Sequence, residues 1–452
     1  MNTNVNQRTN QETLLLVAIS SLDRWFDTMR GPEGYGGPVA HWWQNCLQFT
    51  GAGLDWRYEG IIIGYLNLYK KTGDAKWLEK ACRAGEDLIN GQLPSGNYRN
   101  SSFELNPYPG GTPHEAACDL ALLHLAAVLN QKEKASGDRF LASARRNIYE
   151  YYIAKLWDPR ANCFRDSTTL TWFVPNKAAS VAEAILTLAQ LTGDDELVAV
   201  YALPTLDSIL DHQVSSGRMD GAIYQNSNSG RMVPKFFPYY IAHCILALVA
   251  GYELVQNDRY LDAAYRAMAF VLNWQYDDGS FPQVVYENGR INRFPQWIAA
   301  VGVILRAMNL LVPYGIRSDP EPAQSWMLAG QEASGGIRTA HGFASQISQR
   351  RPGHLPEFRD LLPVVGWNDR AFRYLTDILP INSSFPIAEA IDLPGFRDEI
   401  QPVLLECTSR GIEMEYREDA NIIELRQSNR PHYRWIKGEK WAAICAPALM
   451  VK

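Results

Sequence analysis

The chain has few of the features that point to disulfide stapling or to a structural metal. Only seven of its 452 residues are cysteines, at positions 46, 82, 118, 163, 244, 407 and 445, and no two of them form a CxxC pair. An odd number of widely spaced cysteines favours reduced thiols over a disulfide framework or a zinc cluster. We therefore expect no metal site, and we expect several of these thiols to fill the core.

Long apolar runs and clusters of basic residues are also lacking. No segment reaches about 18 uninterrupted apolar residues, the minimum for a membrane-spanning helix. The net charge is −6 and no Lys/Arg run is present, so phosphate backbones and anionic lipids are not attracted. Residues 1–25 lack the basic and long apolar regions of a secretory signal. These absences predict a soluble, cytoplasmic protein with neither a nucleic-acid nor a membrane partner.

The sequence contains a repeat instead. One phrase recurs, in which a Gly-Asp or Asn-Asp start is followed by a helix of about fifteen residues and then by Gln and a Gly turn. Clear copies are Gly73–Tyr98, Gly193–Gly217 and Asn257–Phe281, and Gly137–Lys155 is a degraded copy. The six copies end at marker residues that lie 56 to 63 residues apart, namely Arg30, Gln92, Lys155, Gln213, Gln275 and Gln331.

Each part of the phrase has a local physical role. Glycine ends one helix in the left-handed region, an acidic side chain caps the free N–H groups of the next helix, and the Gly turn ends that helix. The predicted caps are Asp74, Asp138, Asp194 and Asp258. The spacing of the markers equals about two helices with their connections, which indicates helical hairpins.

A second set of helices lies between the copies, and four of its members are predicted to open with proline, at Pro113, Pro175, Pro238 and Pro295. Proline fits the first turn of a helix because its missing N–H would be unpaired there anyway. Two further members are predicted to begin near Asp55 and Trp367. Their bodies are apolar almost all round, as expected of helices buried inside a ring. The chain is therefore predicted to be mainly α, with an (α/α)6 toroid of six helical hairpins over residues 1–379.

The pattern changes after about residue 380. Short strands are predicted at residues 402–407, 411–417, 421–426 and 433–437, divided by turn residues. Residues 380–452 are therefore predicted to be a linker and a small antiparallel β-rich region. The loops within residues 331–366 are not placed by the pattern, and they are candidates to cover a cavity.

All inner helices of such a ring begin at the same end, so the residues that follow each proline should surround one cavity mouth. The candidate catalytic residues are His114, Glu115, Asn176, Tyr239, Tyr240 and His243. The candidate substrate-binding residues are Trp56, Arg57, Glu59, Lys177, Gln296 and Trp297. Aromatic side chains that stack on sugar rings, mixed with charged and amide groups, suit a carbohydrate ligand. No cofactor is required.

Structural roles remain open for several of these residues. His114, Glu115 and Asn176 lie near helix N-termini, where they could act only as caps or as partners of the helix dipole. Tyr239 could simply pack against its neighbours. Cys118 and His124, on helix bodies, are expected to belong to the core.

The Gly-Asp phrase and the hairpin period resemble those of the carbohydrate-active α/α toroid enzymes, which include six-hairpin glycosidases, sugar epimerases and toroid polysaccharide lyases. The resemblance covers residues 11–379 and is specific for architecture rather than for activity. The lyases use Asn, His, Tyr and Arg, so it implies roles for Asn176, for Arg57, for His114 or His243, and for Tyr239 or Tyr240.

This resemblance implies β-elimination on a sugar that contains uronic acid. Asn176, with help from Arg57 or Lys177, would neutralise the carboxylate, and a Tyr or a neutral His would remove the C5 proton. Hydrolysis stays open, with two carboxylates chosen from Asp55, Glu59, Glu115, Asp119 and Glu183. Epimerisation by two histidines and a non-catalytic sugar-binding role stay open too.

A second resemblance concerns Arg266–Phe281, which is similar to the QW repeat of triterpene cyclases. The repeat is a structural clamp in those proteins. Their Asp-rich proton donor, DxDD, occurs nowhere in this chain. A terpenoid-cyclase-like toroid is therefore kept only as an alternative, and the oligomeric state is left open.

Overall fold

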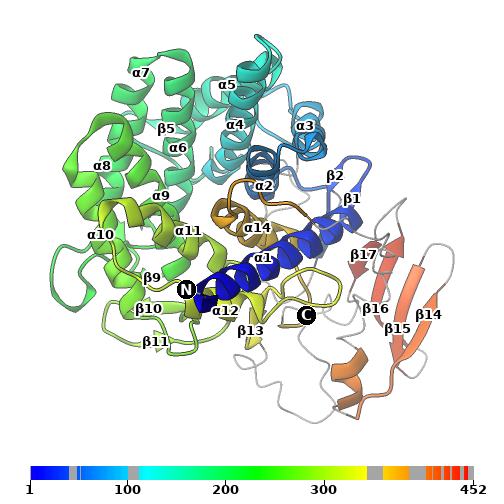
Figure 1. Cartoon of the computed structure of the whole chain (residues 1–452). Helices are drawn as coiled ribbons and strands as arrows, with labels where there is room; N and C mark the ends of the chain where they lie inside the picture. Colours follow the sequence, from blue (N-terminus) through cyan, green and yellow to red (C-terminus); the bar gives the residue numbers. More distant parts are fainter. Residues whose placement is uncertain are drawn as a thin grey trace.

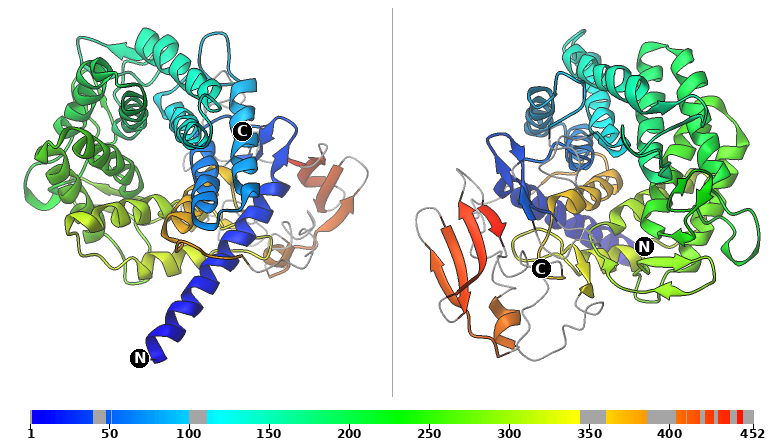
Figure 2. Two further views of the ribbon diagram at one scale, coloured as in Figure 1. Left: turned by 45° about the horizontal axis from the view of Figure 1, so that its top comes forward. Right: turned by 180° about the vertical axis from the view of Figure 1, so that it is seen from behind.

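The computed structural model describes residues 2–39, 48–50, 52–99, 111–343, 360–385, 404–409, 411–418, 422–427, 430–437 and 442–445. Within these residues, helices pair into hairpins that follow one another around a closed ring (Figures 1 and 2).

The inner ring consists of six helices that each pack against the next one. They are α2 (Arg57–Thr72), α4 (Ala116–Lys132), α6 (Pro175–Thr192), α9 (Pro238–Val255), α11 (Val301–Leu311) and α14 (Val365–Ile378). The last of them, α14, packs against α2, so the ring is closed. Most side chains of these helices are buried, which explains their nearly uniform apolar composition. The predicted α class and (α/α)6 toroid are confirmed.

Each inner helix has an outer partner. The outer segments are α1 (Asn2–Thr28), α3 (Ala75–Asn90), α5 (Asp138–Asn147) with η2 (Ile148–Leu156), α7 (Asp195–Leu197) with η3 (Val198–Ala202) and α8 (Leu203–Asp211), α10 (Asp258–Asn273) and α12 (Glu321–Leu328). α3 packs on α2, α5 on α4, α8 on α6, α10 on α9 and α12 on α11. α1 packs on α14, so the first and last helices of the ring form one hairpin.

The repeated glutamine joins successive hairpins. Gln331 Nε2 donates to the Gly335 carbonyl at 2.8 Å, in its own turn, and to the Ala18 carbonyl of α1 at 3.0 Å. Gln92 and Gln213 also bind a carbonyl of their own turn and one of the next outer helix, α5 or α10. One amide group thus sets both the turn and the spacing between outer helices, which accounts for its recurrence.

The helix starts agree with the sequence pattern in part. Asp74 and Asp194 are confirmed as caps, since their side chains accept backbone N–H groups of the first turn. The caps predicted at Asp138 and Asp258 are wrong, because the preceding residue takes the N-cap position in both helices. In α10 that residue is Asn257, whose side chain accepts the Arg259 N–H at 3.2 Å.

The prediction that an inner helix begins at Pro295 is wrong. Gln296 and Trp297 form strand β12 (Gln296–Trp297), which pairs with β13 (Ala340–His341), and α11 begins only at Val301. The pairing with β13 is a long-range contact that a local pattern does not reveal. Pro113 begins a 3-10 turn, η1 (Pro113–Glu115), that leads into α4, and Pro175 and Pro238 open α6 and α9.

The connections are short strands and turns. They comprise β1 (Arg30–Gly31), β2 (Gly34–Tyr35), β3 (Gly37–Val39), β4 (Gln48–Thr50), β5 (Trp157–Asp158), β6 (Cys163–Phe164), η4 (Gly217–Met219), β7 (Ser227–Asn228), β8 (Arg231–Met232), β9 (Lys235–Phe236), β10 (Val284–Tyr286), β11 (Ile291–Asn292) and η5 (Val312–Tyr314).

An antiparallel sheet follows the ring, with strands in the order β14 (Glu415–Glu418), β15 (Ile422–Gln427), β16 (Arg430–Lys437) and β17 (Ala442–Cys445). β17 lies against β3 and β4 (Figure 1). The strand predicted at residues 402–407 is wrong, because residues 404–409 are helical and bury Cys407. The domain boundary at residues 379/380 stays a prediction, and the unplaced loops fall partly on residues 344–359, outside the described residues.

α9 is the one helix, in the part of the chain that the structure describes, that is long and apolar enough to cross a membrane by length and composition. It is also an inner helix of the ring, with 67% of this segment buried. Its position in the ring accounts for its composition.

Candidate functional site

Aromatic side chains meet at the end of the ring where the inner helices begin. Trp56 precedes α2, His114 lies in η1, Tyr239 and His243 lie on α9, and Trp367 lies on α14. Consecutive ring centroids are 4.4 Å apart for Trp56 and His114, 5.8 Å for His114 and His243, and 5.0 Å for His243 and Tyr239. The circle of rings is completed by centroid distances of 5.3 Å from Tyr239 to Trp367 and 5.5 Å from Trp367 back to Trp56. We call these five side chains the aromatic circuit.

The aromatic circuit spans the interior of the ring. α6 lies between α4 and α9, and α11 lies between α9 and α14. The contact of His114 with His243 therefore reaches across the lumen, and so does that of Tyr239 with Trp367. Two local contacts hold the tryptophans: Trp56 Nε1 donates to the Gly366 carbonyl at 2.5 Å, and Trp297 of β12 stacks on Trp367 at 4.7 Å.

Three polar atoms of the aromatic circuit have no hydrogen-bond partner among the described residues. They are His114 Nε2, His243 Nε2 and the Tyr239 hydroxyl, on side chains of residues that are 7%, 5% and 6% exposed. Leaving such a buried group unpaired costs about 1–3 kcal/mol. Buried polar groups without partners are uncommon in native proteins, and their clustering points to a place where a ligand supplies the partners.

Burial keeps both imidazoles neutral. It lowers the pKa of His243 to about 3, and the positive charge of Arg370 acts in the same direction. Burial likewise holds the pKa of His114 well below its usual value, with further contributions from His243 and Arg370. A neutral imidazole has one nitrogen that donates and one that accepts. Burial raises the pKa of Tyr239 above its usual value, so its hydroxyl stays protonated and favours a donor role.

A cluster of arginines lies around one carboxylate deeper in the ring. Glu59 of α2 accepts hydrogen bonds from Arg370 and Arg373 of α14 and from Arg306 of α11. Arg306 also lies 3.5 Å from Glu183 of α6. Burial alone would raise the pKa of Glu59, but the three guanidinium groups outweigh it and hold that pKa below its usual value. We call these three arginines with Glu59 the arginine cluster.

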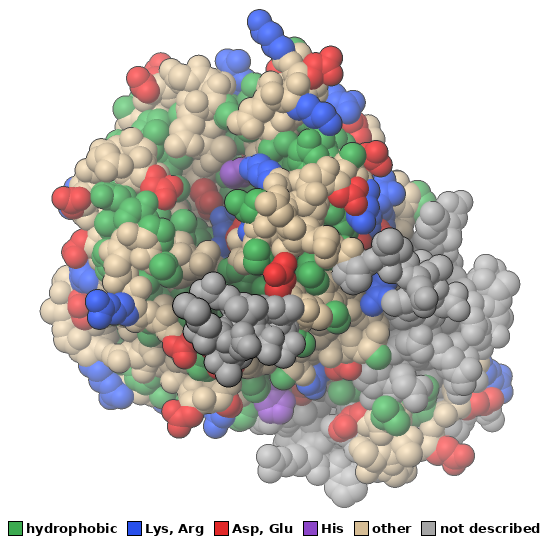
Figure 3. Space-filling model, viewed as in Figure 1, with side chains coloured by type: hydrophobic (Ala, Val, Ile, Leu, Met, Phe, Trp, Pro, Cys, Tyr) green, Lys and Arg blue, Asp and Glu red, His purple; other side chains and the backbone are tan. Residues whose placement is uncertain are grey.

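The arginine cluster depends on close helix packing. A Cβ atom at Gly60 or at Gly302 would collide with the backbone of α14 at Asp369 or Arg370, so α14 fits tightly between α2 and α11. Figure 3 shows charged side chains of both signs and a histidine inside a hollow between the helices. Sequence analysis missed Arg370, because the sixth hairpin lacks a proline marker. The indication that the sequence offered is that Arg370 follows Trp367 by three residues, which places both on one face of a helix.

The structure turns Arg57 and Glu115 away from the aromatic circuit. Arg57 is fully buried, and its Nε and Nη2 donate to Asp55 at 2.7 and 2.9 Å. This ion pair leaves Arg57 no access to a substrate carboxylate in the lumen. Glu115 accepts from Asn147 at 3.2 Å, beside Asp119, in a separate buried polar group between α4 and α5.

The remaining candidates lie around the circuit without joining it. Gln296 is buried and donates to Ser280 Oγ, and Lys177 pairs with Asp166 at 3.0 Å. Tyr240 is half-buried and packs on Tyr239. Asn176 is buried in the first turn of α6, the helix between α4 and α9. Of the candidates, the structure thus brings together Trp56, His114, Tyr239 and His243, with Trp297 against them.

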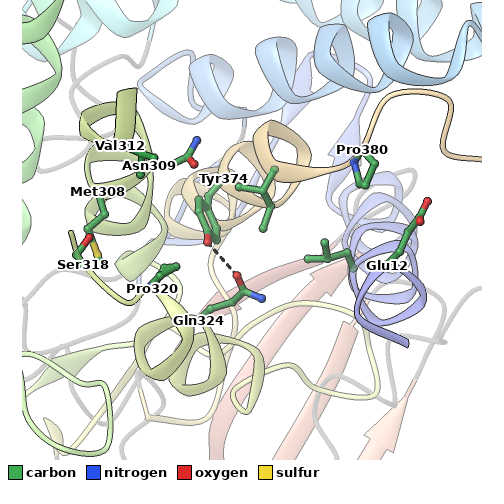
Figure 4. A pocket seen from close by; sticks show the side chains of 11 residues that line it. Glu12, Met308, Asn309, Val312, Ser318, Pro320, Gln324, Tyr374 and Pro380 are labelled. Carbon is green, nitrogen blue, oxygen red and sulfur yellow. Dashed lines mark hydrogen bonds between the residues drawn. The ribbon is translucent and has the colours of Figure 1, made fainter. Parts of the chain in front are cut away.

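A cavity of about 500 Å³ lies at the other end of the ring (Figure 4). α1, α11, α12 and α14 surround it, and Tyr374 donates to Gln324 there at 2.9 Å. Its walls include Met308 and Ile378, near the ends of α11 and α14, whereas Trp367 is near the start of α14. This cavity is therefore separate from the aromatic circuit. Among the described residues, no group of three or more His, Cys, Asp or Glu side chains is placed to hold a metal ion.

Comparison with known structures identifies the architecture. The chain superposes on D-mannose isomerase with a TM-score of 0.60 at 13% identity, covering 81% of this chain and 97% of that one. For cellobiose 2-epimerase from Bacillus thermoamylovorans the TM-score is 0.59 at 12% identity, with coverage of 83% and 100%. The fold is that of the six-hairpin toroid enzymes. An unsaturated glucuronyl hydrolase from Bacillus sp. GL1 matches with a TM-score of 0.53 at 14% identity, with coverage of 82% and 95%.

Sequence comparisons add one local match. The family model described as pectic acid lyase matches residues 242–299, which include His243 and most of α9. No curated protein matches the chain by sequence. The resemblance to carbohydrate-active toroid enzymes is thus confirmed at the level of the fold, and these structural neighbours are carbohydrate-processing enzymes.

Proposed function

We propose that this protein is a carbohydrate-active enzyme that removes a proton from a sugar carbon next to a carboxylate or carbonyl group, with His114 and His243 as its acid–base pair. The observation that carries this proposal is the pair of neutral imidazoles that meet edge to face inside the ring, with their centroids 5.8 Å apart and an angle of 84° between their planes. One neutral imidazole can accept a proton while the other donates one. The isomerase and the epimerase among the structural neighbours support this class of chemistry on the same fold.

Two reactions begin with this step. In β-elimination, the sugar is a uronic acid and the oxygen on the next carbon leaves after the proton is removed. The protonated Tyr239 is a suitable donor for that oxygen. In epimerisation, the second imidazole returns a proton from the opposite face. We place β-elimination first, because the pectic acid lyase match includes His243 and pectic acid is a polymer of uronic acid.

All five carboxylates named as candidates for hydrolysis have polar partners within the protein, and for Glu183 the partner is Arg306 at 3.5 Å. Asp55 is paired with Arg57, and Glu59 is held by three arginines. Glu115 and Asp119 both accept hydrogen bonds from Asn147, outside the lumen. These contacts favour histidine chemistry over a carboxylate pair.

Deuterium exchange tests the proposal. The protein would be incubated in D2O with a panel of uronate oligosaccharides and reducing sugars, and NMR would report deuterium at the carbon that loses its proton. Ultraviolet absorbance would report the unsaturated product of elimination. His114→Gln and His243→Gln should each slow exchange by about 100-fold or more, since general acid–base groups contribute on that order.

His212→Gln is the matched control. His212 is also buried, but its two ring nitrogens contact the Ser208 carbonyl and Ser227 Oγ at 2.7 Å each, outside the lumen. This variant should exchange at the wild-type rate when it is folded. Exchange or elimination that persists in both lumen variants, or the absence of both deuterium and unsaturated product with every sugar in the wild type, would refute the assignment.

A further inference from the structure

We propose that Arg370 binds the carboxylate of the substrate, so that the sugar taken by the lumen is a uronate. This inference rests on the proposed function and adds to it a substrate class and a residue. It also assigns to α14 a part of the role that the sequence suggested for Asn176 with help from Arg57 or Lys177.

The position of Arg370 is the first argument. It follows Trp367 by three residues on α14, so the two side chains share one helix face and Arg370 lies about one turn deeper than the aromatic circuit. Arg370 is only 3% exposed. Among the charged groups around the aromatic circuit, it has the largest effect on both His243 and Tyr239. Its positive charge therefore acts on the two groups that would move protons.

The unused hydrogen-bonding capacity of Arg370 is the second argument. One nitrogen, Nη1, donates to Glu59. Nη2 and Nε are buried and donate no hydrogen bond to any described residue, although Nε lies 3.3 Å from Asp369 Oδ2 in an ion pair. A guanidinium carries five N–H donors in a planar fork that matches a carboxylate. Arg370 is thus anchored at one nitrogen and has donors left for a ligand.

The charge balance is the third argument. The arginine cluster sets three guanidinium groups around Glu59. Three further carboxyl groups lie near them: Glu183 at 3.5 Å and Asp377 at 3.8 Å from Arg306, and Asp369 at 3.3 Å from Arg370. Burial raises the pKa of the neighbouring Glu183, and it holds the pKa of Asp369 well above its usual value. Burial thus disfavours the charged form of these two carboxyl groups. Guanidinium groups buried in this way attract an anionic ligand, because the surroundings screen their charge poorly.

The chemistry of a uronate fits this position. Removal of the C5 proton transfers that proton to a histidine Nε2 and leaves the electron pair on C5, delocalised into the carboxylate oxygens. A guanidinium on those oxygens stabilises the added negative charge. The pair then forms the C4–C5 double bond as the C4–O bond breaks, and the leaving oxygen takes a proton from a donor such as Tyr239. No oxidant or further reactant is needed.

Calorimetric binding of a galacturonate trisaccharide and of its methyl ester tests the inference. The two ligands differ in the charge of the carboxyl groups. Wild type should bind the acid at least about tenfold more tightly than the ester, which corresponds to about 1.4 kcal/mol. Arg370→Lys, which keeps the charge but loses the planar fork, should lose most of that preference while binding of the ester changes little.

A second variant and a control separate binding from folding. The double variant Glu59→Gln/Arg370→Gln removes one charge of each sign and should show no preference for the acid. Arg30→Lys is the control, because Arg30 is also paired with a buried carboxylate, Asp87, but through two nitrogens, at 2.5 and 2.6 Å, and outside the lumen. The control should keep the preference. A wild type that binds acid and ester equally overturns the inference without any variant, and so does a folded Arg370→Lys protein that retains the preference.

The outcome is distinguishable from that of the proposed function. Binding of the acid that depends on Arg370, with neither deuterium exchange nor an unsaturated product, would leave the carboxylate site standing and reject the proton-transfer chemistry. Exchange that depends on His114 and His243, with no preference for the acid, would do the reverse.

Discussion

At the scale of single residues, the site is defined by polar groups that are buried without partners in the described part of the chain. His114, His243 and Tyr239 share one space and keep their protonation states because burial disfavours charge on each of them. Neutral imidazoles in such a place are suited to exchange protons with a bound sugar. Apolar side chains would fill the same space without the free-energy cost of burying unpaired polar groups.

The pH dependence of turnover follows from these states. A base must be unprotonated to act, and the pKa of His243 is about 3 in the free protein. We therefore expect kcat/KM to stay level from about pH 8 down to about pH 5, because kcat/KM reports the free enzyme. Steady-state rates on a uronate substrate across this range would check it. An acid limb with its midpoint near the ordinary histidine value of about 6.5 would contradict the assignment.

The two imidazoles also make the stability of the fold depend on pH. The folded-state pKa of each imidazole lies below its unfolded value, so protonation favours the unfolded chain. This contribution to stability is present above about pH 6.5 and is lost as the pH falls toward about 3. The thermal midpoint should therefore be measured at each acidic pH at which a rate is measured, so that unfolding is not mistaken for loss of catalysis.

The sequence revealed part of the site and the reason is local. His114 and Tyr239 directly follow prolines that open inner segments, so chain position alone predicted that they would meet. Arg57 was predicted to join the site for the same reason, but it forms an ion pair with its neighbour Asp55. Arg370 became visible only when α14 was placed between α2 and α11, because its role depends on contacts with other helices.

At the scale of elements, the repeat is a device for joining hairpins. Gln331 ties its own turn to α1, and Gly335 in that turn has a φ of 100° and approaches the Ser21 carbonyl too closely to allow a side chain. The sequence predicted the helices and their order well, because caps, prolines and apolar faces are local signals. It failed at β12, where pairing with β13 competes with helix formation.

Gly335→Ala should destabilise the protein more than Gly193→Ala. Both glycines have positive φ, so a side chain costs about 1–2 kcal/mol at either position. A Cβ at Gly335 would also collide with Ser21, whereas nothing lies within 4 Å of one at Gly193. Denaturant unfolding of the two variants would measure the difference, and equal midpoints would argue against the clamp.

At the scale of the whole molecule, the ring is closed by elements from both ends of the toroid. α1 packs on α14, with the rings of Phe26 and Phe372 5.3 Å apart, and it lies beside the turn that follows α12. Each inner helix therefore depends for its packing on the helices on both sides of it. Contacts of this kind make stability a property of the closed ring.

Deletion of residues 2–28 should destabilise the ring. It removes the outer partner of α14 and exposes the face that carries Phe372, which is buried in the intact protein. We expect a lower thermal midpoint and loss of a single cooperative transition, both restored in part by adding the 2–28 segment as a separate peptide. Calorimetry would show this, and an unchanged transition in the truncated chain would contradict it.

The pairing of α1 with the end of the toroid also sets a delay during translation. Ala18 and Gln331 are 313 residues apart, so α1 leaves the ribosome long before the segment that it binds has been made. At ordinary elongation rates of about 5–20 residues per second, this interval is roughly 15 to 60 s. During this interval α1 can already bind the first hairpin, since Asp23 accepts hydrogen bonds from Tyr65 and Lys80, but its face for α14 and for the turn after α12 has no native partner, which exposes that face to chaperones and to aggregation until the toroid is finished.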